Sequence, residues 1–167
     1  MEKKYILAIN PGSTSTKIAV YNGTTPKFIQ TLRHSTEELE QYPVVTDQFA
    51  FRKEIILEQI ENEDIDISSI KIVMGRGGLL KPVESGIIEV NQKMLDDLSS
   101  CKYGEHASNL GGMIAHDIVK DIEGARAFIA NPVVVDEFDE KARFSGHPLF
   151  PRKSIFHALN QKAVATE

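Results

Sequence analysis

The sequence predicts an α/β fold with a mixed sheet, which begins with a meander of three antiparallel strands and is flanked by helices. An apolar run at residues 6–9 and a mainly apolar strand at 17–21 are separated by a turn rich in glycine, serine and threonine. Asn22 and Gly23 then favour a tight hairpin into a third strand at residues 27–33. Further along, amphipathic helices alternate with short apolar strands, a pattern typical of α/β crossovers.

The turn after the first strand is the clearest candidate for a binding site. Asn10 and Pro11 are expected to end the strand, and Gly12 accepts backbone angles that side chains forbid. Residues 13–16 place four hydroxyls beside exposed backbone N–H groups. Such a turn suits a phosphate. It is not a P-loop, because the GxxxxGK[ST] spacing and the following helix are both missing.

The rest of the chain divides into short elements. Helices are predicted from apolar residues at helical spacing and from capping residues, and strands from short apolar runs. In order, we expect a helical turn at 36–39, a helix from the cap Asp47 to residue 62 with Arg52 on its polar face, a strand at 70–74, a small strand at 86–90, a helix capped by Asn91, a helix from 109 or 110 to 122, a strand at 125–130 and a final helix capped by Ser154.

Composition narrows the class of protein. The chain has 167 residues, 41% of them apolar, which is enough for one domain with a real core or for part of a larger protein. A net charge of -5 without a basic run gives no reason to expect a nucleic acid partner. One cysteine, Cys101, excludes an internal disulfide and fits a reducing compartment. No apolar run is long enough for a signal peptide or a membrane span, so we expect a cytoplasmic protein with no membrane partner.

Three more polar residues lie at the ends of predicted elements, where an α/β scaffold carries its sites. Arg76, in the turn GRGG, is either an anion ligand whose flanking glycines give an anion room, or a surface arginine. His106, just before a helix, could donate to a phosphoryl oxygen or be merely structural. Asp136, after an apolar run, could bind Mg2+, orient a group or cap the next turn.

The segment NPGSTSTK resembles the N-terminal signature of the acetokinase family, N-x-G-S-[ST]-S-x-[KE]. Three later segments are most similar to butyrate kinase and its branched-chain carboxylate kinase relatives within that family: GRGGLLKP, EHASNLGG and NPVVVDEFD. This resemblance implies a ribonuclease H-like lobe of the actin-like ATPase type, as in the wider superfamily of acetate and sugar kinases, Hsp70 and actin. All six specified positions of the signature match: Asn10, Gly12, Ser13, Thr14, Ser15 and Lys17.

The same resemblance assigns roles to single residues. It implies that Arg76, His106 and Asp136 are catalytic, that Asn10 and Asp136 help to hold Mg2+, and that the six signature residues line the phosphate end of the site. His157 joins this set through the pair Phe156 and His157, although the rest of that family motif is missing here. Phe156 and the pair at 79–80 are candidates for an apolar wall around an acyl chain, or for ordinary core.

The implied activity is reversible transfer of the γ-phosphoryl group of ATP to butyrate or a similar short or branched-chain carboxylate. Enzymes of the family have two related lobes, and residues 1–167 match the N-terminal one. On this resemblance we expect the C-terminal nucleotide-binding lobe to be missing from the chain and the isolated chain to be inactive. For the full-length protein the resemblance implies ATP or ADP and Mg2+ as cofactors, and a homo-oligomer.

Three other readings stay open at this point. The chain could be a lobe of an acetate or propionate kinase, or a non-catalytic actin-like module that binds phosphate or a protein. It could also be part of a sugar kinase in which Asp136 acts as a base toward a hydroxyl. The Asn-, Gln- and Trp-rich substrate loop expected of a sugar kinase is not evident, and the chain has no Trp.

Overall fold

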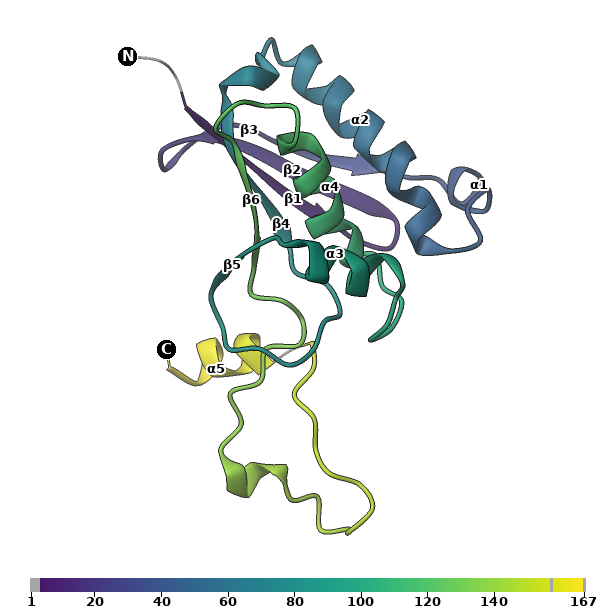
Figure 1. Cartoon of the computed structure of the whole chain (residues 1–167), viewed down its shortest axis with the longest axis vertical. Coiled ribbons are helices and arrows are strands. Elements are labelled where there is room, and N and C mark those ends of the chain that lie inside the picture. The colour runs from purple at the N-terminus through teal and green to yellow at the C-terminus, as the bar shows by residue number, and fades with distance from the viewer. Residues whose placement is uncertain (1–3, 157, 167) are drawn as a thin grey trace.

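The computed structural model describes residues 4–156 and 158–166 and contains one six-stranded mixed sheet with the strand order β3-β2-β1-β4-β6-β5. The first three strands form the predicted antiparallel meander, whereas β4 and β6 run parallel to β1, and β5 is antiparallel to β6 (Figure 1). The predicted fold class is confirmed. The strands are β1 (Tyr5–Pro11), β2 (Ser15–Asn22), β3 (Thr25–Arg33), β4 (Ile70–Arg76), β5 (Ile87–Glu89) and β6 (Arg126–Ala130), and the helices are α1 (Thr36–Leu39), α2 (Phe49–Asn62), α3 (Gln92–Ser99), α4 (Asn109–Val119) and α5 (Ala158–Thr166).

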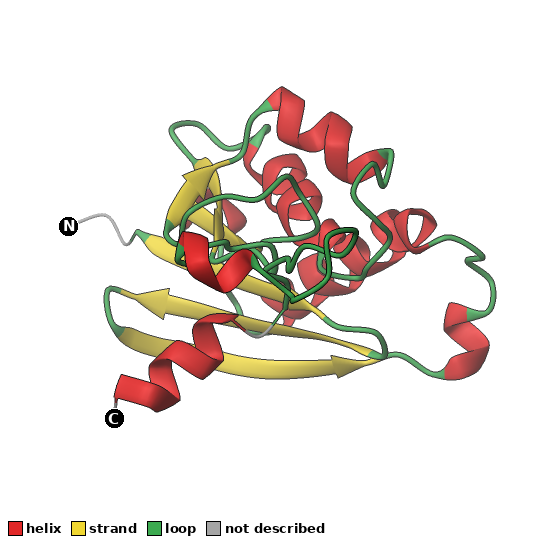
Figure 2. Ribbon diagram, turned by 90° about the horizontal axis from the view of Figure 1, so that it is seen from below, coloured by secondary structure: helices red, strands yellow, loops and turns green. Residues whose placement is uncertain are grey.

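One face of the sheet carries the core. Alternate residues of the strands, among them Leu7, Ile9 and Val73, are buried against helices α2, α3 and α4, which gather on the same side of the strands (Figure 2). The opposite face is more open, and Ile29 on β3 is 65% exposed there. Side chains that alternate with the core residues on β1, β2 and β4 therefore face outward.

Several element boundaries differ from the predicted ones. β4 runs past residue 74, so Arg76 is the last residue of a strand and not part of a turn. β1 continues through Pro11, because its pairing with β4 stops at Ile9 and the missing N–H of proline removes no bond on that side. Residues 45–48 form a 3-10 turn, so α2 starts at Phe49 and Asp47 does not cap it. Helix α4 ends at Val119, short of residue 122. Ser154 caps no helix either, because its hydroxyl donates to the Val135 carbonyl at 2.6 Å.

The contact between β4 and α4 is a contact of backbones. A Cβ on Gly75 would lie 2.2 Å from the carbonyl oxygen of Gly111, and a Cβ on Gly111 would lie 2.4 Å from that of Arg76. Beside it, the buried side chain of Asn109 accepts from the Leu79 N–H at 2.8 Å and donates to the Gly104 carbonyl at 2.9 Å. The helix is thus held at backbone distance from the end of β4.

We expect the substitution Gly111→Ala to lower the free energy of unfolding by about 3 kcal/mol, because the added methyl group meets backbone that cannot move aside. The matched control is Gly112→Ala, whose Cβ meets only side-chain methyl groups of Ile129 and Leu98 at 3.1 and 3.2 Å. There a helical alanine regains up to about 1 kcal/mol. Urea unfolding followed by circular dichroism measures both, and equal losses would contradict the backbone contact.

Candidate functional site

Asn10, Lys17 and Arg76 lie together on the open face of the sheet, at the carboxyl ends of β1 and β4. Asn10 pairs across the strands with Lys17, and the parallel neighbours Ile9 and Gly75 bring Arg76 beside Asn10. The Arg76 Nη1 donates to Asn10 Oδ1 over 3.4 Å. All three side chains are exposed to solvent. This places two cations and an amide at one edge of the sheet, which suits an anionic ligand.

The turn from Gly12 to Thr14 borders this group. The Gly12 N–H donates to the Ser15 carbonyl at 2.7 Å, and Ser13 and Thr14 are exposed. Thr16, however, is fully buried on the helix side, where its hydroxyl bonds His34 Nε2 at 2.9 Å. Of the four hydroxyls expected at a ligand, therefore, the one from Thr16 serves the core.

His106 lies half-buried in the loop before α4, with Nδ1 2.8 Å from the Ser108 hydroxyl. The Ser108 backbone N–H donates to the same Nδ1 at 3.2 Å, so in the neutral ring the proton is on Nε2. Burial, and then the positive charge of Arg76, lower the pKa of His106. The ring is therefore neutral at pH 7 and available as an N–H donor in the neighbourhood of Arg76.

Asp136 is bound by residues outside the group of Asn10, Lys17 and Arg76. Its Oδ2 forms an ion pair with Arg143 at 2.8 Å and its Oδ1 accepts from the Phe138 N–H at 3.1 Å. The hydrogen bond from Arg143 is the first cause of the lowered pKa of Asp136, so the carboxylate is ionised at pH 7. The structure thus bonds Arg76 to Asn10, places His106 within the electrostatic influence of Arg76, and gives Asp136 different partners.

The residues predicted to hold Mg2+ carry donor atoms of the type that this ion binds. Asn10 and Asp136 offer an amide oxygen and a carboxylate, the oxygen donors that Mg2+ takes, and this ion keeps several waters and needs few protein ligands. Within residues 4–156 and 158–166, no three His, Cys, Asp or Glu side chains gather as a metal-binding cluster. His157, predicted to bind phosphate, lies outside the described residues.

A pocket of about 280 Å³ opens beside Arg76. The ring of Phe156 lies 5.6 Å from the ring of His106, at the wall of this pocket. Leu79 and Leu80, the other wall candidates, are only 6% exposed and belong to the core. The pocket thus combines one guanidinium with side chains that are mostly apolar, although polar atoms contribute the larger part of its exposed surface: Ala130, Asn131, Pro132, Val133, Val135, Phe156 and Leu159.

The glycines around Arg76 serve packing. The GRGG turn was expected to leave room for an anion, but a Cβ on Gly77 would lie 2.5 Å from Pro132, and one on Gly78 would lie 2.6 Å from Asn109. Gly75 makes the backbone contact with α4 described above. These glycines allow neighbouring chain segments to approach closely, and this approach fixes the backbone from which the Arg76 side chain projects.

Two arginines near the site have positions or partners that the sequence analysis did not predict. Arg52, expected on the polar face of α2, is fully buried and bonds the Gly12 to Thr16 turn. Its position four and eight residues before the buried Ile56 and Ile60 places it on the apolar stripe of the helix, a signal present in the sequence. Arg143, the partner of Asp136, comes from a short 3-10 turn at Glu140–Arg143 and has no such signal.

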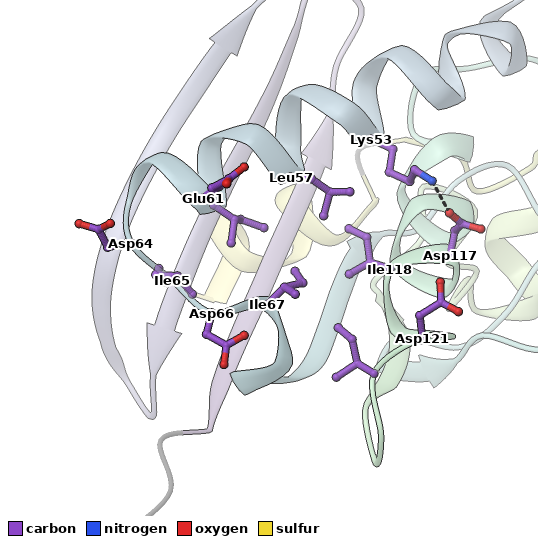
Figure 3. Close-up of a pocket in the computed structure, with 12 residues that line it drawn as sticks. Lys53, Leu57, Glu61, Asp64, Ile65, Asp66, Ile67, Asp117, Ile118 and Asp121 are labelled. Carbon is purple, nitrogen blue, oxygen red and sulfur yellow. Dashed lines mark hydrogen bonds and ion pairs between the residues drawn. The ribbon is translucent and has the colours of Figure 1, made fainter.

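A larger cavity, about 700 Å³, lies at the amino-terminal ends of β4 and β6, between α2 and α4 (Figure 3). Leu57, Ile67 and Ile118 line its interior, while Glu61 and Asp64 are among the acidic residues around it. Ligands of open α/β sheets bind at the carboxyl ends of the strands, so this cavity is at the wrong end for the site. None of the predicted site residues lines it.

Within the described part of the chain, no helix has the length and apolar content needed to cross a membrane. Cys101 is a free thiol.

We expect Arg76→Met to raise the pKa of His106, because the Arg76 charge is one of the two causes that lower it. Burial, the larger cause, remains, so the pKa should stay below its ordinary value. The His106 ring signals in an NMR titration report this pKa directly. The control is Arg126→Met, which removes an exposed arginine paired with Glu89 at the other end of β6. An unchanged His106 pKa in Arg76→Met would show that the two groups do not interact.

Comparison with known proteins gives homologues along almost the whole chain. Butyrate kinase 1 and butyrate kinase 2 of Clostridium acetobutylicum are 58% and 56% identical over 160 residues, 96% of this chain and 45% of each relative. A probable butyrate kinase of Clostridium botulinum is 52% identical over the same length. The chain thus spans about half the length of the curated relatives it matches. No family model matches the chain.

Solved structures agree on the fold. The acetate kinase of Entamoeba histolytica superposes with a TM-score of 0.62 at 15% identity, over 98% of this chain and 45% of that one. The acetate kinase of Porphyromonas gingivalis gives a TM-score of 0.61 at 14% identity, over 98% and 49%. Together these likenesses confirm the resemblance seen in NPGSTSTK: the chain is similar to butyrate kinases in sequence and to acetate kinases in fold.

Proposed function

We propose that the chain is the N-terminal lobe of a carboxylate kinase, which transfers the γ-phosphoryl group of ATP to butyrate or a similar short or branched-chain carboxylate. The observation that carries the proposal is the position of Arg76. On one side it donates to Asn10, which borders the hydroxyl-rich turn, and on the other it lines a pocket whose side chains are mostly apolar. A carboxylate with a short apolar tail fits this combination, and the butyrate kinase relatives support the same substrate class.

In the proposed reaction a carboxylate oxygen attacks the γ-phosphorus. The new O–P bond forms as the bond from the γ-phosphorus to the β,γ-bridging oxygen breaks, and ADP leaves with that electron pair. The carboxylate is already ionised, so no strong general base is needed. Catalysis then depends on holding the two reactants in line and on neutralising charge at the phosphoryl oxygens.

The described residues can hold the reactants in line and neutralise charge at the phosphoryl oxygens. Arg76 pairs with the substrate carboxylate and with the transferred phosphoryl group, and the neutral His106 donates from Nε2 to an equatorial phosphoryl oxygen. Ser13, Thr14, Ser15 and Lys17 line the phosphate end with Gly12. His157 is proposed as a further phosphate ligand from the sequence alone.

When bound, Mg2+ would neutralise phosphate charge during the transfer, with Asn10 and Asp136 as its candidate protein ligands. Asp136 is prepared for this by its ionised state and by the Arg143 contact that holds it.

The nucleotide would lie between this lobe and a second one, as the resemblance implies. The proposed enzyme acts in the cytoplasm, consistent with its free Cys101, and as a homo-oligomer when full-length. A lobe of an acetate or propionate kinase is the second candidate, supported by the likeness of fold. A non-catalytic module would not require the anion group, the neutral histidine and the apolar pocket side by side.

The test is acyl phosphate formation by the full-length gene product, trapped with hydroxylamine and measured with a panel of acids. Butyrate or isobutyrate hydroxamate is the expected product, whereas acetate or propionate as best substrate selects the second candidate. No product with any acid would contradict the proposal. In an active enzyme, Arg76→Ala should lower kcat by about 10² to 10³-fold while the fold survives. The exposed Arg126→Ala is the matched control, and near-normal turnover of Arg76→Ala would remove Arg76 from the site.

The pocket makes a separate prediction about the acyl chain. Leu159→Ala should raise the KM for butyrate by up to about tenfold, because burial of each methylene against the wall is worth about 0.8 kcal/mol. Acetate, with one methyl group, should be affected less, so the preference shifts toward the shorter acid. Leu57→Ala, in the cavity at the other end of the sheet, is the control. An unchanged ratio of kcat/KM for the two acids would show that the acyl chain binds elsewhere.

A further inference from the structure

Arg52 is a buried cation directly behind the proposed phosphate turn. It lies in the first part of α2, its side chain is 0% exposed, and Ile56 and Ile60 continue the same buried stripe. Burying a charge is costly unless its hydrogen bonds are satisfied. Each nitrogen of the guanidinium has an acceptor in the structure, and these acceptors are mainly in the turn.

The contacts are specific. Nη1 donates to the carbonyls of Gly12 at 2.8 Å and Ser15 at 3.2 Å and to the Thr16 hydroxyl at 3.0 Å, while Nη2 donates to the Ser13 carbonyl at 3.2 Å. Nε and Nη2 both reach Gln48 Oε1, at 3.0 and 2.8 Å. A planar fork with five N–H groups can serve so many acceptors at once, and a lysine ammonium cannot.

These contacts determine where the amide groups of the turn point. In a trans peptide the C=O and the following N–H point in opposite directions, and the described chain has no cis peptide. Because the carbonyls of Gly12 and Ser13 point at Arg52, the N–H groups of Ser13 and Thr14 point away from it. Both residues are exposed, so two successive N–H groups face solvent, an arrangement that binds anions.

The charge of Arg52 is not cancelled nearby. All its hydrogen-bond acceptors are neutral, and no carboxylate among the described residues forms an ion pair with it. Burial lowers the pKa of Arg52 to about 10, so the group stays protonated at neutral pH. Its positive field thus adds to the outward N–H dipoles of the turn.

We propose that Arg52 is the positioning residue of the anion site: it holds the Gly12 to Thr16 turn with two N–H groups facing the ligand and supplies an uncancelled positive charge behind them. The inference rests on the proposed function, because it assigns the phosphate end of that site to this turn. Thr16 and His34 extend this hydrogen-bond network, since the Thr16 hydroxyl lies between the guanidinium and His34 Nε2 and bonds both.

The experiment measures phosphate binding to the turn directly. Inorganic phosphate, and separately ATP, is titrated into the full chain while the backbone amide signals of Ser13 and Thr14 are followed by NMR. The variants are Arg52→Lys, which keeps the charge without the fork, and Arg52→Met, which removes both. Lys53→Met is the control, because the adjacent Lys53 pairs with Asp117 at 2.8 Å, away from the turn. Thr16→Val removes one acceptor at almost equal volume and serves if both Arg52 variants fail to fold.

We expect phosphate affinity of the folded protein to fall by about tenfold in Arg52→Lys and further in Arg52→Met, with a smaller loss in Thr16→Val and none in Lys53→Met. In the full-length enzyme, Arg52→Lys should lower kcat/KM for ATP and leave the KM for the carboxylate unchanged.

The two proposals fail in different ways. If the wild-type turn amides respond to neither phosphate nor ATP, the anion site itself is wrong, and the assignment of Arg52 falls with it. If they respond, and a folded Arg52→Lys or Thr16→Val binds phosphate as tightly as the wild type, the proposed function stands and the role of Arg52 is overturned. A purely structural arginine would change the melting temperature without changing the affinity of the folded protein.

Discussion

The close approach of α4 to β4 is the constraint on which the site depends. Where Gly111 meets the Arg76 carbonyl, helix and strand are separated by no side chain, so the helix fixes the backbone of the strand end. From the first residue of the same helix, Asn109 braces Leu79 on one side and Gly104 on the other. The loop that carries His106 is therefore tied to the strand that carries Arg76. A site whose parts lie 30 residues apart in sequence is held by one helix end.

Much of the fold could be predicted because its signals are local. The Asn22 and Gly23 hairpin, the Asn91 cap and the alternation of strands with helices each depend on a few neighbouring residues, and the structure has all of them. The errors have two origins. Asp47 is not a helix cap because residues 45–48 form a local 3-10 turn before α2. Ser154 bonds the Val135 carbonyl, a partner 19 residues away that periodicity cannot reveal.

The candidate site, too, could be predicted only in part. Sequence resemblance selected Asn10, Arg76 and His106; the sheet register brings Asn10 and Arg76 to one edge, and the loop before α4 carries His106. The function of the glycines could not be inferred in the same way, because a glycine required by a packed helix and a glycine required by a ligand look alike in sequence. Arg52 was misplaced since a charged residue is normally solvated. Only the acceptors on the Gly12 to Thr16 turn, about 40 residues earlier in the chain, make its burial possible.

The pocket beside Arg76 has a consequence for how such enzymes diversify. Besides Arg76, its lining comes from residues 130–133, Val135, Phe156 and Leu159, while the phosphate turn and its support come from residues 10–52. The two groups share no residue. Under the proposed function, mutations that reshape the lining can retune the choice of acid during evolution without disturbing the geometry of phosphoryl transfer. Chain-length preference and phosphoryl transfer would then depend on separate sets of residues.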